Sequence, residues 1–114
     1  MLGLDDLKQF AESRRIEKHE LDSKPFWVRE LNTGEMQECK ERFDKAGFDP
    51  ENVSAFMVFM SLWSVCNEQG QRAFTDDDFT TFNTLPASKA RVITKAVSAV
   101  HSLSVSDGED SEKN

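Results

Sequence analysis

The sequence lacks an excess of basic residues, and this absence limits the partners it can bind. It contains 14 Lys and Arg residues against 21 Asp and Glu residues, which gives a formal net charge of −7 at pH 7. Because nucleic-acid binding depends on clustered Lys and Arg side chains that neutralise phosphates, this balance argues against a nucleic-acid partner. The negative charge favours solubility and is compatible with a basic protein partner.

A signal peptide, a membrane span and a disulfide framework are also missing. The N-terminal residues MLGLDDLKQF have no basic region followed by an apolar run, as a secretory signal peptide would. The most apolar stretch, residues 53–66, covers 14 residues. A helix needs about 20 residues to cross a bilayer, so no membrane partner is expected. We interpret the two cysteines, Cys39 and Cys66, as buried thiols on apolar helix faces in a reducing compartment.

The chain is organised around that apolar stretch, VSAFMVFMSLWSVC. At helical spacing, Phe56, Met60 and Trp63 lie on one stripe, and further apolar residues extend the surface almost all the way round. A helix that is apolar on every side is normally buried by neighbours on several faces. We therefore predict that residues 50–66 form the central and most buried helix of the domain.

The rest of the chain predicts a mainly α-helical fold with a minor β-strand or hairpin near the N-terminus. Apolar periodicity and helix start and stop signals place the other helices at 4–11, 34–46, 76–84 and 87–103. The aromatic and β-branched segment FWVREL predicts a strand at 26–31, for which residues 14–17 are the best hairpin partner. Residues 19–24 are expected to be a loop.

A single helical domain is expected over residues 1–103, followed by a disordered acidic tail at 104–114. The tail has one apolar residue and four acidic residues, so it cannot bury enough surface to become ordered. Within the domain, Gly47 is expected to end one helix, and Asp49 and Pro50 to begin the central one. Thr75 is expected to cap the helix at 76–84, with an aspartate in place of the usual Glu or Gln three residues later.

The sequence offers no convincing metal site. The run around Gly70 invites comparison with a calcium-binding EF-hand loop, but that alignment puts Val65 at position 1, where an oxygen ligand is required. A zinc site would have to use Cys39, Cys66, His19 and His101, and no two of these have the short spacing of a structural zinc site. We interpret them as buried thiols and surface histidines.

Catalytic motifs are missing as well. There is no G-x-S-x-G, P-loop or HExxH motif, and the adjacent acids Asp76, Asp77 and Asp78 are explained by a helix N-terminus. We therefore predict a protein that is not an enzyme and needs no cofactor.

Two surfaces remain as candidates for binding a partner. Phe26 and Trp27 follow a proline and can form an exposed aromatic anchor, although packing of at least one of them against the central helix is the favoured interpretation. Lys89, Arg91 and Lys95 form a basic face on the last helix, which is more often simply solvated than a docking site. We take these five residues as the candidate partner-binding residues.

The order of the segments resembles that of a known family. VREL leads into N-T-G-E-M and two helices, and SVCNEQGQRAFTDDDFTTFNTLP then precedes the last helix. Over residues 26–103 this order is similar to that of the tail assembly chaperones of long-tailed (siphophage) bacterial viruses, whereas the first 25 residues match nothing in that family. The family's turn, acidic segment and L-P step correspond here to Gly70, Phe74, Thr75, Asp76, Asp77, Asp78, Leu85 and Pro86.

The resemblance implies a non-enzymatic protein made late in infection in the host cell cytoplasm. It implies binding to the tape measure protein, which such chaperones keep soluble until tail tube protein subunits polymerise around it, and absence from the mature virion. It also implies that a longer form can arise by ribosomal frameshifting, with residues 104–114 replaced or extended. A homo-oligomer is compatible with this interpretation, and the oligomeric state stays open.

An alternative from a different class is a small acidic helical adaptor or regulatory protein, similar to an antitoxin or an anti-repressor, that shares only a helical core. The position of the gene discriminates between the two. A gene between those for a major tail protein and a very long tape measure protein would favour the chaperone.

Overall fold

The computed structural model describes residues 1–101, which form a helical domain with a small sheet. The chain begins with α1 (Leu4–Glu12), β1 (Ile16–Leu21) and β2 (Lys24–Arg29). It continues with α2 (Thr33–Lys45), α3 (Val53–Ser64), β3 (Val65–Cys66), the 3-10 helix η1 (Asp76–Asp78), α4 (Phe79–Phe82) and α5 (Ala87–Val100). The mainly α-helical class with a minor β component is confirmed. The predicted tail at 104–114, the boundary at 103 and the last residues of the predicted final helix lie outside the described residues.

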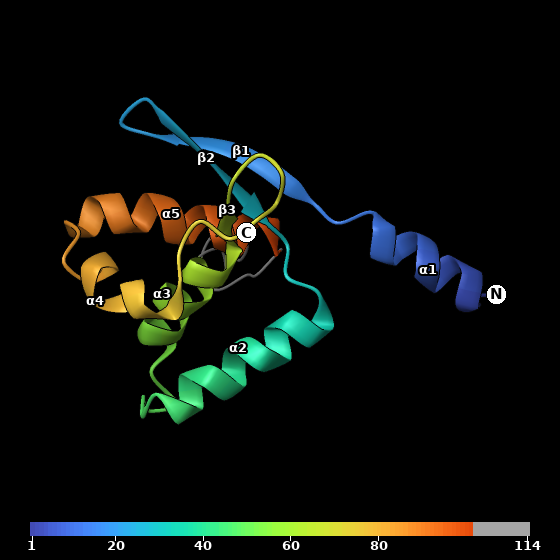
Figure 1. Cartoon of the computed structure of the whole chain (residues 1–114), viewed down its shortest axis with the longest axis horizontal. Coiled ribbons are helices and arrows are strands. Elements are labelled where there is room, and N and C mark those ends of the chain that lie inside the picture. The colour runs from blue at the N-terminus through green and yellow to red at the C-terminus, as the bar shows by residue number, and fades with distance from the viewer. Residues whose placement is uncertain (102–114) are drawn as a thin grey trace, which may run out of the picture.

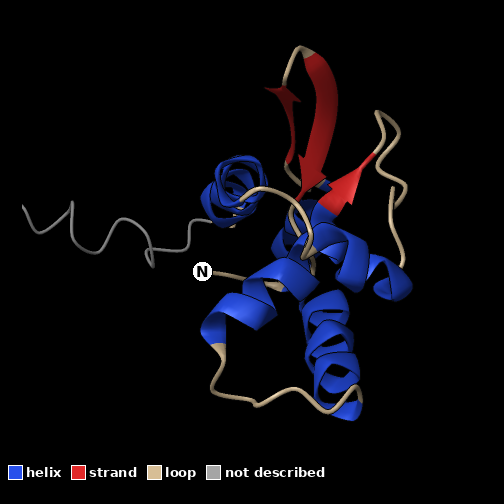
Figure 2. Cartoon of the chain, turned by 90° about the vertical axis from the view of Figure 1, so that its left-hand side faces the viewer, coloured by secondary structure: helices blue, strands red, loops and turns tan. Residues whose placement is uncertain are grey.

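The helix α3 lies at the centre of this arrangement. α2, α4, η1 and α5 all contact it, and β3 continues directly from its end. α5 also packs against β1 and β2 (Figure 1). Figure 2 shows the three strands grouped at one end of the molecule, with helices below them. α1 projects from the rest of the fold (Figure 1), and none of its residues is buried.

The burial of α3 confirms the central prediction from the sequence. Every residue from Phe59 to Ser64 is buried, and Met60 and Trp63 keep only 1% and 5% of their surface exposed. Phe56 is half-buried, because it lies on the first half of the helix near the surface. The second half of α3 is thus the part that neighbours surround on all sides.

The predicted start of this helix was three residues too early. α3 begins at Val53, and its N-cap is Asn52, whose side-chain oxygen accepts a hydrogen bond from the Ala55 amide at 3.0 Å. Asp49 instead accepts a hydrogen bond from the Glu51 amide at 2.9 Å and forms a turn before the helix. Two cap-like residues, Asp49 and Asn52, therefore lie close together in the sequence, and the second one starts the helix.

The predicted end of this helix, at residue 66, was wrong because the last two residues form a strand. Val65 and Cys66 do not continue the helix but form β3, which pairs antiparallel with Trp27 and Val28 of β2. The carbonyl groups at the end of α3 consequently lose their usual helical partners. Arg29 donates a hydrogen bond to the Trp63 carbonyl at 3.1 Å, and Arg72 donates two to the Leu62 carbonyl at 3.2 and 3.0 Å.

Arg72 also contacts the aromatic ring at the end of α3, together with Arg42 of α2. The Arg72 guanidinium lies 4.4 Å from the centroid of the Trp63 ring, and that of Arg42 lies 5.4 Å from it. Asp76 accepts hydrogen bonds from both arginines, at 3.1 Å from Arg72 and 3.4 Å from Arg42. This cluster joins α2, the end of α3 and η1 through charged groups packed on one indole ring.

The sheet has the order β1-β2-β3 and is antiparallel throughout. The predicted hairpin is confirmed, but β1 is longer than the predicted partner at 14–17 and β2 lies two residues earlier than the predicted strand at 26–31. Residues 19–24 are consequently mostly strand instead of loop. Ile16 pairs with Arg29 and Leu21 with Lys24, across a two-residue turn at Asp22 and Ser23. Both turn residues have positive φ, 52° and 69°, as a type I′ hairpin turn requires. The sequence pattern concealed this turn because neither residue is the glycine that usually occupies such positions.

Five phenylalanine rings pack together on the side of the core formed by α2, α3 and α4. Phe43 of α2 stacks on Phe48 with ring centroids 4.8 Å apart, and Phe48 lies 4.7 Å from Phe79 of α4. Phe56 and Phe59 of α3 meet the ring of Phe43 edge-on at 5.2 and 5.7 Å. Such edge-to-face pairs are favoured beyond their apolar area alone.

The other predicted helix boundaries are largely confirmed. Asn32 and Glu35 form a capping box at the start of α2, and Gly47 follows the end of α2 with a φ of 90°. The helix predicted at 76–84 is the 3-10 turn η1 followed by the single turn α4. At its start Asp78 accepts a hydrogen bond from the Thr75 amide at 2.9 Å, whereas the Thr75 side chain makes no capping hydrogen bond. Thr75 is thus the N-cap residue, as predicted, and the side-chain hydrogen bond at this end comes from Asp78 at the third position.

Candidate binding surfaces

The two aromatic residues proposed from the sequence do not form one anchor. Phe26 and Trp27 are neighbours on β2, so their side chains point to opposite faces of the sheet. Phe26 stacks on His19 at 5.6 Å and packs against the core. Trp27 lies on the other face, where the Lys18 ammonium is 5.7 Å from its ring centroid. Both rings are half-buried.

The three basic residues of α5 also have different surroundings. Lys89 forms an ion pair with Asp22 in the hairpin turn, so it ties α5 to the sheet. Arg91 and Lys95 are exposed to solvent. Binding of a partner by Phe26, Trp27, Lys89, Arg91 or Lys95 stays a prediction.

An apolar pocket lies close to the Lys89–Asp22 ion pair. It has a volume of about 290 Å³ and is lined almost entirely by apolar side chains from β1, α3, α4, α5 and the loop before η1. The lining residues are Leu21, Leu62, Phe74, Asp78, Thr81, Phe82, Leu85 and Ile93. Phe74 is 37% exposed, so part of its ring is accessible from solvent. We call this feature the Phe74 pocket. It has the apolar lining of a site that receives an apolar side chain of another molecule.

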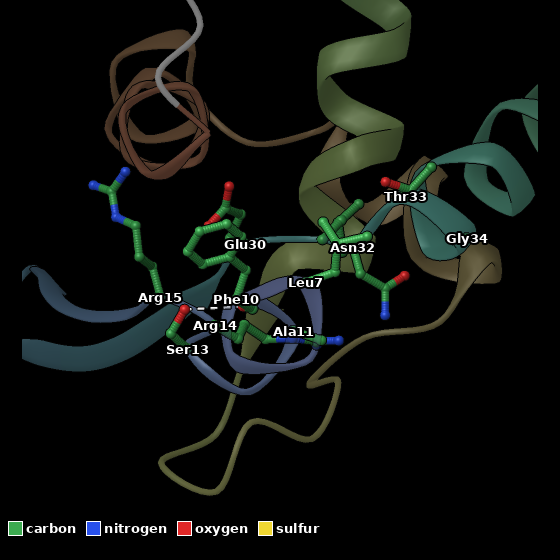
Figure 3. Close-up of a pocket in the computed structure, with 11 residues that line it drawn as sticks. Leu7, Phe10, Ala11, Ser13, Arg14, Arg15, Glu30, Asn32, Thr33 and Gly34 are labelled. Carbon is green, nitrogen blue, oxygen red and sulfur yellow. Dashed lines mark hydrogen bonds between the residues drawn. The ribbon is translucent and has the colours of Figure 1, made fainter. Parts of the chain in front are cut away.

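A second hollow lies between α1 and the segment that connects β2 to α2. Figure 3 shows its lining, which combines α1, Arg14, Arg15 and residues 30–34. The volume is about 870 Å³, and the lining is more polar than that of the Phe74 pocket. We call this feature the α1 groove. The sequence indicated an apolar face on α1 but not that this face is left largely exposed.

The cysteines and histidines do not come together as a metal site. Within residues 1–101, no three His, Cys, Asp or Glu side chains are grouped so that they could hold a metal ion. Cys39 and Cys66 are both buried free thiols, on α2 and β3 respectively, and burial raises the pKa of Cys39 to about 12. No helix of the described part is long and apolar enough to span a membrane.

His101 is not the surface residue expected from the sequence but a link between two segments. Its Nε2 accepts a hydrogen bond from the Leu31 amide at 2.9 Å, and its Nδ1 lies 2.9 Å from the Val97 carbonyl, to which it donates. Both contacts need the neutral ring, with the proton on Nδ1. Burial, partly opposed by the Val97 hydrogen bond, lowers the pKa of His101 below its ordinary value of 6.5.

We expect His101 to make the stability of the domain depend on pH. Because the folded-state pKa is below the unfolded-state value, the unfolded chain binds the proton more readily. The stabilisation is therefore fully present above about pH 6.5 and is lost as the pH falls through the lowered pKa. Urea titrations between about pH 5 and 7.5 should show this loss in the natural chain and less of it in His101→Asn. Equal pH slopes in the two chains would contradict this assignment.

Comparison with known proteins gives a match at the level of the fold. The structure of the bacteriophage HK97 tail assembly chaperone is similar to this chain with a TM-score of 0.51 and 16% sequence identity. The match covers 80% of this chain and 94% of the HK97 chain. No protein-family model and no curated protein matches the sequence. At this identity the likeness shows a shared fold.

Proposed function

We propose that this protein is a tail assembly chaperone of a long-tailed bacteriophage. The observation that carries the proposal is the shared fold with the HK97 tail assembly chaperone over 94% of that chain. The order of segments over residues 26–103 supports it from the sequence side. In this proposal the protein acts in the host cell cytoplasm as a binding protein without catalysis or cofactor.

The client in this proposal is the tape measure protein, held until tail tube protein subunits assemble around it. A long helical client exposes apolar stripes, and a chaperone for it needs apolar pockets surrounded by polar residues. The Phe74 pocket has this character, with Asp78 and Thr81 beside its apolar lining and the Lys89–Asp22 ion pair nearby. The net charge of −7 favours the solubility of such a complex.

A co-expression experiment tests this proposal. A tape measure protein from the same genome is expressed alone and with the full chain, and its soluble fraction is measured, followed by pull-down. We expect the chain to increase the soluble fraction of the client without added nucleotide or metal. Phe74→Glu should lower the amount recovered by about tenfold or more, since it puts a charge at the mouth of an apolar pocket.

Val53→Glu is the matched control for this experiment. Val53 is also an exposed apolar residue, with 57% of its surface accessible, but it lies at the start of α3 and does not line the Phe74 pocket. It should recover as much client as the natural chain does. An insoluble client in the presence of the folded natural chain would refute the chaperone function and favour the adaptor alternative. Equal losses in the two variants would refute the role of the pocket.

A further inference from the structure

One side of the Phe74 pocket is polar, and the rest of its lining is apolar. Phe82 and Ile93 are buried, whereas Phe74 keeps 37% of its surface exposed. The polar side consists of Asp78 and Thr81, which are three positions apart along η1 and α4 and therefore lie on the same side of these turns. Binding pockets with a mostly apolar lining use a small number of polar groups to fix the orientation of what they bind.

The carboxylate of Asp78 has hydrogen-bonding capacity that the fold leaves unused. Its Oδ2 atom accepts a hydrogen bond from the Thr75 amide at 2.9 Å. An ionised carboxylate accepts at both oxygens, at about four positions in all. In the part of the chain that the structure describes, no donor is hydrogen-bonded to Oδ1 of Asp78. Because Asp78 is half-buried, a donor that enters the pocket competes with less water for this oxygen than it would at an exposed carboxylate.

The charged groups around the pocket do not favour a charged ligand. Asp22 and Lys89 form an ion pair with each other, and Asp76 is paired with arginines. Two further charged residues adjoin the lining, Asp77 in sequence and Lys24 across the hairpin, and their charges are opposite in sign. Burying a cation among apolar side chains is costly, whereas a neutral N–H that finds an acceptor costs much less. The ligand that matches this pocket is therefore apolar and uncharged, with one hydrogen-bond donor.

The size of the pocket suits a side chain with two rings. Its volume is about 290 Å³. An apolar cavity of roughly 150 Å³ already holds a benzene molecule. Phe74 and Phe82 in the lining are aromatic, and ring pairs are favoured beyond their apolar area alone. Only tryptophan among the natural amino acids has a side chain with two rings, and its indole N–H is a neutral donor that usually finds a partner when it is buried.

We propose that the Phe74 pocket binds the indole ring of a tryptophan side chain of a partner protein, with the indole N–H donating a hydrogen bond to the Asp78 carboxylate. The apolar lining provides affinity for any large ring, and Asp78 provides the preference for a ring with a donor. Tryptophan is also among the side chains that most often dominate the binding energy of interfaces. The identification of the partner as the tape measure protein rests on the proposed function, whereas the specificity of the pocket does not.

A comparison of indole with N-methylindole tests the site, because a methyl group replaces the proton of the N–H donor. Each compound is titrated into the isotope-labelled full chain, and the amide chemical shifts followed by NMR show which residues it contacts. We expect the largest shifts at the residues that line the Phe74 pocket. Indole should bind with a dissociation constant of about 1 mM, as befits a single small ring. It should bind at least about fivefold more tightly than N-methylindole does.

Asp78→Asn should abolish this preference. The asparagine amide oxygen can still accept the Thr75 hydrogen bond, so the start of η1 is preserved, and thermal unfolding checks this. The affinity for indole should fall by at least about fivefold, and that for N-methylindole should change by less than about twofold. Asp77→Asn is the matched control: it removes the same charge from the neighbouring residue, which does not line the pocket, and should keep the preference.

The other outcomes would overturn the proposal. Equal affinities of the natural chain for indole and N-methylindole would mean that the pocket takes any large apolar ring. A preference for indole that persists in Asp78→Asn would mean that another group, such as Thr81, accepts the hydrogen bond. Tighter binding of ethylguanidinium than of indole would identify a basic side chain as the occupant. The absence of shifts in the pocket at about 10 mM indole would mean that it is not an indole site.

The co-expression experiment separates this proposal from the chaperone function. Asp78→Asn should recover less tape measure protein than the natural chain does, and Asp77→Asn should recover as much. A client that the natural chain keeps soluble although the pocket binds no indole would refute the tryptophan site and leave the chaperone function standing. An insoluble client together with the expected indole preference would refute the chaperone function and support the site.

Discussion

Phe59→Ala is expected to lower the free energy of unfolding by about 3–5 kcal/mol, which is the usual cost of removing a buried phenylalanine ring. Phe59 is 2% exposed and its ring meets those of Phe43, Phe48 and Phe79. Removing it leaves a cavity between α2, α3 and α4 that the remaining rings cannot fill without leaving their own positions. The loss is a large part of the roughly 5–15 kcal/mol by which a domain is stable.

A urea titration followed by tryptophan fluorescence measures this effect. Val53→Ala is the control, since Val53 is on the same helix but 57% exposed, and it should change the unfolding free energy by less than about 0.5 kcal/mol. A loss below about 1 kcal/mol for Phe59→Ala would mean that the second half of α3 is not the centre of the core.

Arg72→Ala should have the second largest effect, with a loss of about 2 kcal/mol or more. The change leaves the buried Leu62 carbonyl without its two hydrogen bonds, and an unsatisfied buried acceptor costs about 1–3 kcal/mol. It also removes the guanidinium from the face of the Trp63 ring and from Asp76. The cation and the ring add a further contribution of about 0.5–1 kcal/mol.

Substitution of Arg72 by lysine separates the contribution of the positive charge from that of the planar guanidinium group. Arg72→Lys keeps the charge but cannot donate a planar pair of hydrogen bonds to one carbonyl, so it should recover only a small part of the loss. Arg91→Ala, an exposed arginine on α5, is the control and should be nearly neutral. Full stability in Arg72→Lys would show that a positive charge alone is sufficient at the end of α3.

The sequence allowed the helices to be predicted well where the apolar pattern was continuous. The central helix, its burial and the stop at Gly47 followed from local residue types. The last two residues of the predicted helix could not be assigned correctly, because Val65 and Cys66 are as apolar as the helix before them. What ends the helix is the approach of β2 and of two arginines from distant positions, and a local pattern does not contain that information.

The candidate binding surfaces were harder to predict from the sequence than the helices were. The sequence suggested Phe26 and Trp27 as one aromatic anchor, yet strand geometry places their side chains on opposite faces of the sheet. The Phe74 pocket gathers residues from β1, α3, α5 and the chain between residues 74 and 85, so no spacing could reveal it. The apolar stripe of α1 was visible, but whether another element covers such a stripe is decided only by the tertiary structure.

The arginine contacts at the end of α3 also constrain the order of folding. Arg29 reaches the Trp63 carbonyl across 34 residues, and Arg72 returns to the Leu62 carbonyl from 10 residues downstream. The carbonyl groups of Leu62 and Trp63 therefore gain these partners only when segments distant in sequence come together. These contacts require the chain on both sides of the helix end to close into loops, and the entropic cost of closing a loop grows with its length. We therefore expect strand pairing and completion of the end of α3 to be coupled in folding.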